Sequence, residues 1–238
     1  MCKIDLHQYE IRLPVKESLR ISVASDIHAT AQYKEIVGLI KDTAPDVIFI
    51  PGDLCHYADD CRIPVEFLHL AKDVAPVYYT FGNHERNTDE SLYNINGVHL
   101  LNDKAERLGD IVIGGLRSGF RGQAENAVME TPAPDLRFLD DFDTMDGVKL
   151  LLCHHPEYYP RYLRDRNIDL IFAGHAHGGQ WRLFGKGLFA PGQGLFPKYT
   201  SGIYEDRLIV SPGLANTVVV PRLFNPPALL TVDILPLN

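Results

Sequence analysis

Five short groups of carboxylate, amide and imidazole side chains stand directly after apolar runs in this sequence of 238 residues. In the first and last groups the ligand types are two positions apart, and in an extended chain that spacing points both side chains to the same side. Nitrogen and oxygen ligands without thiolates favour Mn, Fe, Zn or Co over a cysteine-rich structural zinc site. The sequence therefore predicts a site for divalent metal ions, built from Asp26-Ile-His28, Gly52-Asp53, Gly82-Asn-His-Glu85, His154-His-Pro156 and Gly174-His-Ala-His177.

Such a set of residues suits phosphoryl transfer. One carboxylate can bridge two cations about 3.5–4 Å apart, and such a pair clamps the attacking and leaving oxygens and lowers the pKa of a bound water to roughly 7. His84 is the candidate donor for the departing oxygen, because an imidazole can give up a proton near neutral pH. A glycine precedes Asp53, Asn83 and His175, and we expect it to allow a sharp turn that leaves the next side chain facing outward.

The apolar runs before these groups are predicted to be strands buried on both faces, at 20–25, 47–50, 77–81, 149–153 and 170–173. Helical spacing of apolar residues predicts helices at 32–41, 65–72, 134–142 and 157–166. This alternation indicates an α/β architecture with parallel pairing, in which ligands bind at the carboxyl ends of the strands. Further strands at 9–13, 207–211 and 229–234 and a hairpin at 108–116 are too many for one sheet, so we expect two packed sheets with outer helices.

Composition limits the classes of partner. The chain has 31 acidic and 23 basic side chains, a formal charge of −8, and 45% apolar residues, which excludes disorder as a global description. Net acidity argues against binding to duplex nucleic acid, while a local cation can still attract a small phosphorylated substrate into one pocket. No repeat or low-complexity linker appears, so residues 1–238 are predicted to form a single domain.

The cysteines and the N-terminal residues predict the cellular compartment of the protein. Four cysteines without a C-x-x-C pair are expected to be reduced thiols rather than a disulfide framework. The first seven residues contain an acid and no apolar core, unlike a signal peptide, and no apolar run approaches the ~18 residues of a membrane helix. We therefore expect a soluble, cytoplasmic protein without a membrane segment.

In this order, the five groups resemble the pattern of the calcineurin-like metallophosphoesterases: D-x-H, G-D, G-N-H-E, a later His, and G-H-x-H. The resemblance implies a four-layer α/β/β/α sandwich of two mixed sheets flanked by helices, with two divalent ions. One ion would be held by Asp26, His28, Asp53 and His177, and the other by Asp53, Asn83, His154 and His175. Asp53 would bridge them, and His84 would assist the leaving group. The family's apolar-x-His-x-Pro order makes His154 the ligand rather than His155.

The stretch from Gly174 to Arg182, continued at 197–202, resembles the bacterial phosphodiesterases of the YkuE/YaeI kind, which often carry an N-terminal anchor or export signal that is not recognisable here. Residues 178–202 are rich in Gly, Pro and aromatics and are predicted to form a structured flap near the metals. Arg182 and Lys198 in this flap, and His56 beside the second group, are candidate substrate contacts, although solvated charges are the alternative for the two cations. Glu85 is expected to orient a neighbour rather than to bind metal.

These features predict a metal-dependent phosphoesterase, most specifically a phosphodiesterase that uses a hydroxide bridging two metal ions. A phosphomonoesterase or a nucleotide-sugar pyrophosphatase is the alternative on the same site. A non-catalytic scaffold on the same fold is disfavoured because His84 and every metal position are intact. Mn, Fe, Zn and Co all stay open as the native metals, as do the substrate and the oligomeric state. The sequence contains no P-loop, dinucleotide fingerprint or nucleophile elbow.

Overall fold

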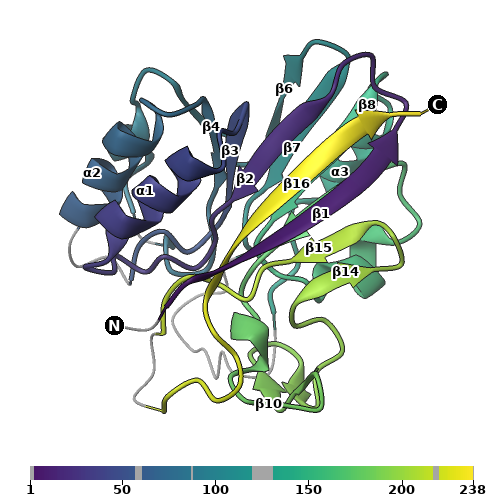
Figure 1. The fold of residues 1–238 in the computed structure, drawn as a ribbon. Coiled ribbons are helices and arrows are strands. Elements are labelled where there is room, and N and C mark those ends of the chain that lie inside the picture. Colours follow the sequence, from purple (N-terminus) through teal and green to yellow (C-terminus); the bar gives the residue numbers. More distant parts are fainter. Residues whose placement is uncertain (1–2, 57–60, 87, 120–130, 217–219, 238) are drawn as a thin grey trace.

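Two six-stranded mixed sheets form the body of the protein in a computed structural model that describes residues 3–56, 61–86, 88–119, 131–216 and 220–237 (Figure 1). The first sheet has the order β1-β16-β2-β3-β4-β5 and the second has the order β14-β15-β9-β8-β7-β6. The strands of the first sheet are β1 (Asp5–Leu13), β2 (Leu19–Val23), β3 (Val47–Pro51), β4 (Val77–Thr80), β5 (Val98–Leu100) and β16 (Ala228–Pro236). Those of the second are β6 (Lys104–Leu108), β7 (Ile111–Leu116), β8 (Val148–Cys153), β9 (Leu170–Ala173), β14 (Gly202–Tyr204) and β15 (Leu208–Val210).

Helices cover the outer face of each sheet. The helices α1 (Tyr33–Asp42) and α2 (Arg62–Ala71) pack on the first sheet, whereas α3 (Leu136–Asp143) packs on the second (Figure 1). Each helix buries residues at spacings of three and four, which lie on one helical face. The structure therefore has the four layers that the family resemblance implies, helix–sheet–sheet–helix.

The central strands are buried on both faces, as their continuous apolar runs predict. On β3, Val47 and Phe49 belong to the core between the two sheets, while Ile48 and Ile50 belong to the core under α1 and α2. This division follows from the alternation of side chains along a strand. Phe49 meets Phe172 of β9 edge to face, with ring centroids 5.1 Å apart, so an aromatic pair joins the two sheets.

One predicted helix differs in type from the structure, and several predicted elements differ in length. The predicted helix at 157–166 is replaced by one π-helical turn at Tyr159–Leu163, in which the N–H of Arg164 donates to the carbonyl of Tyr159, five residues earlier, at 2.9 Å. Pro160 lies in this turn and has no N–H to donate, which weakens regular helical bonding. The predicted hairpin is confirmed but is longer, with β6 and β7 pairing antiparallel.

Among the described residues, no helix is both long and apolar enough to span a membrane.

Candidate metal centre

Loops after β2, β3, β8 and β9 bring six of the seven predicted ligands together. The seventh, Asn83, lies in the loop after β4 next to His84, whose backbone contacts Asp53. Main-chain hydrogen bonds from Asp26 to Gly52 (3.3 Å) and from His28 to Asp53 (3.0 Å) continue the pairing of β2 and β3 into these loops. The backbone N–H of His175, just after β9, donates to the Asp26 carboxylate at 3.0 Å. The loops of the two sheets are therefore fastened to each other at the site itself.

The first ligand group surrounds His28. Its Nε2 lies 3.3 Å from Nε2 of His177 and 3.9 Å from Oδ1 of Asp26, and Nε2 of His177 lies 3.4 Å from the same Asp26 oxygen. Oδ2 of Asp53 is 3.7 Å from Nε2 of His28. Two ligand atoms about 2.1 Å from a metal at tetrahedral angles lie about 3.4 Å apart, so these separations fit atoms around one ion.

The second group surrounds His154. Its Nε2 lies 3.1 Å from Oδ2 of Asp53 and 3.2 Å from Nδ1 of His175. Oδ1 of Asn83 is buried and has no hydrogen-bond partner among the described residues, as expected of an oxygen intended for a cation. The same Asp53 oxygen thus faces both groups, which is the position that a bridging carboxylate needs.

Electrostatics in the site follow from burial and from the carboxylates. Burial alone would raise the pKa of Asp53, but the facing imidazoles of His154 and His84 hold it well below its usual range. Burial alone would lower the pKa of His154, but the charge of Asp53 raises it to about 10. Burial lowers the pKa of the other three ligand histidines, His28, His175 and His177. These three are therefore neutral at physiological pH, which is the form of imidazole that binds metal.

Glycine is required before the predicted ligands for two different physical reasons, backbone conformation and lack of space for a side chain. Gly52 adopts the left-handed backbone expected of it, with φ of 87°. Gly82 and Gly174 do not; a Cβ on Gly82 would overlap the carboxylate of Asp53, and a Cβ on Gly174 would overlap that of Asp26. The expected turns instead fall on the ligands, whose φ angles are positive at Asp26 (54°), His28 (46°), Asp53 (54°), His175 (64°) and His177 (45°). Such conformations are strained for residues other than glycine and cluster at functional sites.

Gly174→Ala is expected to lower metal affinity by about 10–100-fold, the loss typical of changes that displace a supporting group. The new methyl group would push on the Asp26 carboxylate and on the Ser25 hydroxyl. Isothermal titration with Mn²⁺ measures the effect. Gly38→Ala is the matched control, because a Cβ there meets nothing within 4 Å on α1. Equal affinities in the two variants would contradict this account of Gly174.

Glu85 supports the site without belonging to either ligand group. Its Oε2 accepts hydrogen bonds from the N–H groups of Gly82 (2.7 Å) and Asp53 (3.1 Å), and its Oε1 accepts one from Cys55 (2.8 Å). Burial, reinforced by the charge of Asp53, raises the pKa of Glu85 to about 7. These bonds hold the loops after β3 and β4 together, which is the orienting role expected from the sequence.

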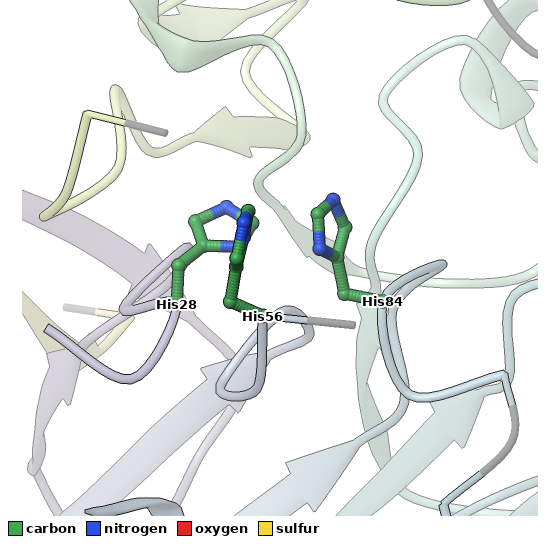
Figure 2. A group of neighbouring side chains, drawn as sticks. All are labelled: His28, His56 and His84. Carbon is green, nitrogen blue, oxygen red and sulfur yellow. The ribbon is translucent and has the colours of Figure 1, made fainter. Parts of the chain in front are cut away.

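Three histidines from separate loops lie close together: His28, His56 and His84 (Figure 2). The ring of His84 lies 4.5 Å from that of His28 and 5.2 Å from that of His56, measured between centroids. Nε2 of His84 is 3.7 Å from Oδ2 of Asp53, and its backbone N–H donates to Oδ1 of the same carboxylate at 3.0 Å. His56 is exposed, and its contact with substrate stays a prediction.

A pocket of about 460 Å³ begins beside His28 and His56. Its walls combine apolar and polar side chains from distant parts of the chain, including Thr30, Gln32, Leu214, Asn216 and Arg222. Arg222 was not predicted: its guanidinium donates to Nδ1 of His177 at 3.1 Å and to the carbonyl of Pro212 at 2.7 Å. No local sequence signal marks Arg222, because only the folded chain brings it to His177.

The predicted flap is structured. It contains two small hairpins, β10 (Arg182–Leu183) with β11 (Lys186–Gly187) and β12 (Phe189–Ala190) with β13 (Gly194–Leu195). Arg182 donates to the carbonyls of Gly178 and Gly185 and so holds the flap itself. Lys198 is exposed and pairs with Glu205 at 3.3 Å. Their contact with substrate therefore stays a prediction.

Comparison with known proteins places this site in a family. The family model described as calcineurin-like phosphoesterase matches residues 19–179, which contain all five ligand groups. The chain is 27% identical over 218 residues to the uncharacterized protein YpbG of Bacillus subtilis, covering 87% of this chain and 78% of that protein. It is 28% identical over 190 residues to the uncharacterized metallophosphoesterase Cj0846 of Campylobacter jejuni, covering 74% and 49%.

A longer relative and a solved structure complete the comparison. The transmembrane protein with metallophosphoesterase domain of Bos taurus is 29% identical over 235 residues, covering 88% of this chain and 51% of its own, so the chain spans about half of that relative and of Cj0846. The crystal structure of TT1561 of Thermus thermophilus shares the fold, with a TM-score of 0.50 and 14% identity over 66% of this chain and 81% of that one. The family match spans well over half of the sequence, and the chain belongs to the calcineurin-like phosphoesterase family.

Proposed function

We propose that the protein hydrolyses phosphodiesters with the help of two divalent metal ions. Metal-dependent phosphoester hydrolysis is what the family supports, and the finer proposal rests on one observation: Oδ2 of Asp53 faces both ligand groups, at 3.1 Å from His154 and 3.7 Å from His28. Two divalent ions held there would neutralise charge on the phosphate oxygens and would supply hydroxide near neutral pH.

The donor atoms fit two such ions. Asp26, His28, Asp53 and His177 would hold the first, and Asp53 with Asn83, His154 and His175 would hold the second. Imidazole nitrogens with hard oxygens and no thiolate suit Mn, Fe, Zn or Co. The buried Oδ1 of Asn83, which has no hydrogen-bond partner among the described residues, would gain one in this arrangement, which supports the assignment.

His84 would act on the leaving oxygen. Burial lowers the pKa of His84, although the charge of Asp53 opposes this shift, and a bound phosphate anion would raise the pKa again by Coulomb attraction. The imidazole can therefore take up a proton when the substrate binds and give it to the departing oxygen. The bond from its backbone N–H to Asp53 fixes its position relative to the proposed metal bridge.

The pocket beside the histidines favours a diester. A diester carries a second organic group on phosphorus, and the pocket of about 460 Å³ next to His28 and His56 can accept one. Leu214 and Ala215 offer apolar contact there, while Gln32 and Asn216 offer hydrogen bonds.

Hydrolysis of paired chromogenic substrates tests the proposal. With Mn²⁺ supplied, we expect kcat/KM for bis(p-nitrophenyl) phosphate to exceed that for p-nitrophenyl phosphate by at least about tenfold, equivalent to about 1.4 kcal/mol in the transition state. The reverse ratio would indicate a phosphomonoesterase, and preference for a nucleotide sugar would indicate a pyrophosphatase. Failure of metal-loaded protein to hydrolyse any of the three would contradict an enzymatic function.

A further inference from the structure

A second group of buried ionisable side chains lies on the other side of the His175 ring. Nδ1 of His175 is 3.2 Å from His154 and so faces the proposed pair of ions. Its other nitrogen, Nε2, is 3.9 Å from Oε1 of Glu157. His155 completes the group, with Nδ1 3.4 Å from the same Glu157 oxygen and its ring centroid 4.3 Å from that of His175. His175 therefore presents one ring nitrogen to each group.

The loop after β8 carries two consecutive histidines that reach different neighbours. Nε2 of His154 lies 3.1 Å from Asp53, whereas Nδ1 of His155 lies 3.4 Å from Glu157. His154 reaches the proposed pair, and His155 reaches away from it toward Glu157. Gly192 of the flap lies against Glu157, and a Cβ at Gly192 would overlap the carboxylate. The group is thus enclosed between the loop after β8 and the flap.

Several buried polar atoms of this group have no hydrogen bond among the described residues. His155 and Glu157 are each only 3% exposed. Both ring nitrogens of His155 and Oε2 of Glu157 are buried and have no hydrogen-bond partner among the described residues. Such atoms are rare in folded proteins because each bears its full desolvation penalty.

Two other buried ionisable side chains, Glu85 and His154, do have hydrogen-bond partners. Glu85 is equally buried, but three backbone N–H groups donate to its oxygens. His154 has its Nδ1 2.9 Å from the carbonyl of Pro51. At Glu157 the side chain of Thr131 donates to Oε1, which leaves Oε2 and the whole of the His155 ring without a bond among the described residues. Protonated His155 can pair with Glu157 across 3.4 Å, and a bound cation would give both His155 and Glu157 a partner.

We propose that His155, Glu157 and Nε2 of His175 hold a third divalent cation, distinct from the pair of the proposed function. One ligand atom from each residue lies within 4.8 Å of the other two. The separations of 3.4 and 3.9 Å from Glu157 Oε1 compare with about 3.4 Å for tetrahedral ligands about 2.1 Å from a zinc ion. Two imidazoles with one carboxylate suit Zn²⁺ or Co²⁺ better than Mg²⁺ or Ca²⁺.

His175 can serve both sites because its two nitrogens point in different directions. Binding a cation at each nitrogen requires the ring to release its remaining proton to solvent, and the two positive charges stabilise the anionic ring that results. The carboxylate of Glu157 contributes a further negative charge to the third ion. A cation in this position would also fix the orientation of His175 toward His154.

Zinc stoichiometry tests the third site without reference to activity. Chelator-treated full-length protein is loaded with Zn²⁺, freed of excess metal by gel filtration, and analysed by mass spectrometry of the metal. We expect three ions per wild-type chain and two in each of the variants Glu157→Gln and His155→Gln. Glu106→Gln is the matched control, because Glu106 also pairs with a histidine, His99 at 2.6 Å, but on the exposed surface. This control is expected to keep three ions.

Other numbers of zinc ions per chain would contradict the third site or the proposed pair. Two ions in both the wild type and Glu157→Gln would overturn the third site and leave Glu157 as a hydrogen-bond partner that orients His175, while the proposed pair would stand. Fewer than two ions in the wild type would overturn the proposed pair as well. Unchanged thermal unfolding of the chelator-treated variants checks that they fold, and the two single variants must agree.

Discussion

Replacing Asp53 with asparagine is expected to remove both ions of the proposed pair together. Oδ2 of Asp53 lies within 3.7 Å of a histidine in each ligand group, so loss of its charge weakens both sites at once. Asparagine has nearly the same shape, and its oxygen can still accept the hydrogen bond that His84 donates from its backbone. Metal binding should weaken by about 100-fold or more, because a ligand itself is changed and not only a group around it. Loss of the buried charge opposite His154 should also lower the stability of the metal-free protein.

Metal analysis after gel filtration measures this effect as ions per chain. We expect two fewer ions in Asp53→Asn than in the wild type, and hydrolysis of any phosphodiester should fall to background. Asp233→Asn is the matched control, because it removes a carboxylate that pairs with Arg20 at 2.7 Å, far from the site in sequence. Loss of only one ion in Asp53→Asn would assign Asp53 to a single site and end the bridging role.

The meeting of the candidate residues at one edge of the sheets could be predicted, because each follows a buried apolar run and parallel pairing brings such strand ends together. Side-chain alternation did not position them, since five of them have positive φ angles. The four layers could be expected for a similar reason, since strands like β3 that are apolar on both faces require cover on both faces.

Contacts between distant segments could not be predicted in the same way. Arg222 meets His177 across 45 residues, and nothing near Arg222 in the sequence indicates a site. The explanation for Gly82 and Gly174 was wrong because it considered only backbone freedom, whereas the structure shows that these positions are crowded by the ligands Asp53 and Asp26. Positive φ at the ligands is likewise a property of the assembled loops.

His155 illustrates the same division. The sequence pattern identified His154 as the ligand and treated His155 only as its neighbour. His154 reaches Asp53 and His155 reaches Glu157, and the presence of Glu157, Thr131 and Gly192 beside His155 depends on tertiary packing. The cluster of His155, Glu157 and His175 could therefore not be predicted from the sequence, because it depends on the contact between the flap and the loop after β8.

His84→Ala is expected to separate metal binding from catalysis. The His84 side chain lies 3.7 Å from Asp53 but is not among the ligands proposed for either ion, so the number of bound ions should not change. Loss of the imidazole removes the proposed proton donor, and general acid catalysis typically contributes about 10²–10⁴ in rate. We expect kcat for an alkyl phosphodiester to fall by about this factor, with a smaller change in KM.

The size of the loss should depend on the leaving group. A nitrophenolate departs readily without a proton, whereas an alkoxide does not, so His84→Ala should retain much more of its activity on bis(p-nitrophenyl) phosphate than on an alkyl diester. His69→Ala, at an exposed position on α2, is the control and should leave both rates unchanged. An equal loss on both substrates would assign His84 to phosphate binding instead. Near-normal turnover of the alkyl diester by His84→Ala would remove His84 from the mechanism, because no proton donor would then be needed at that position.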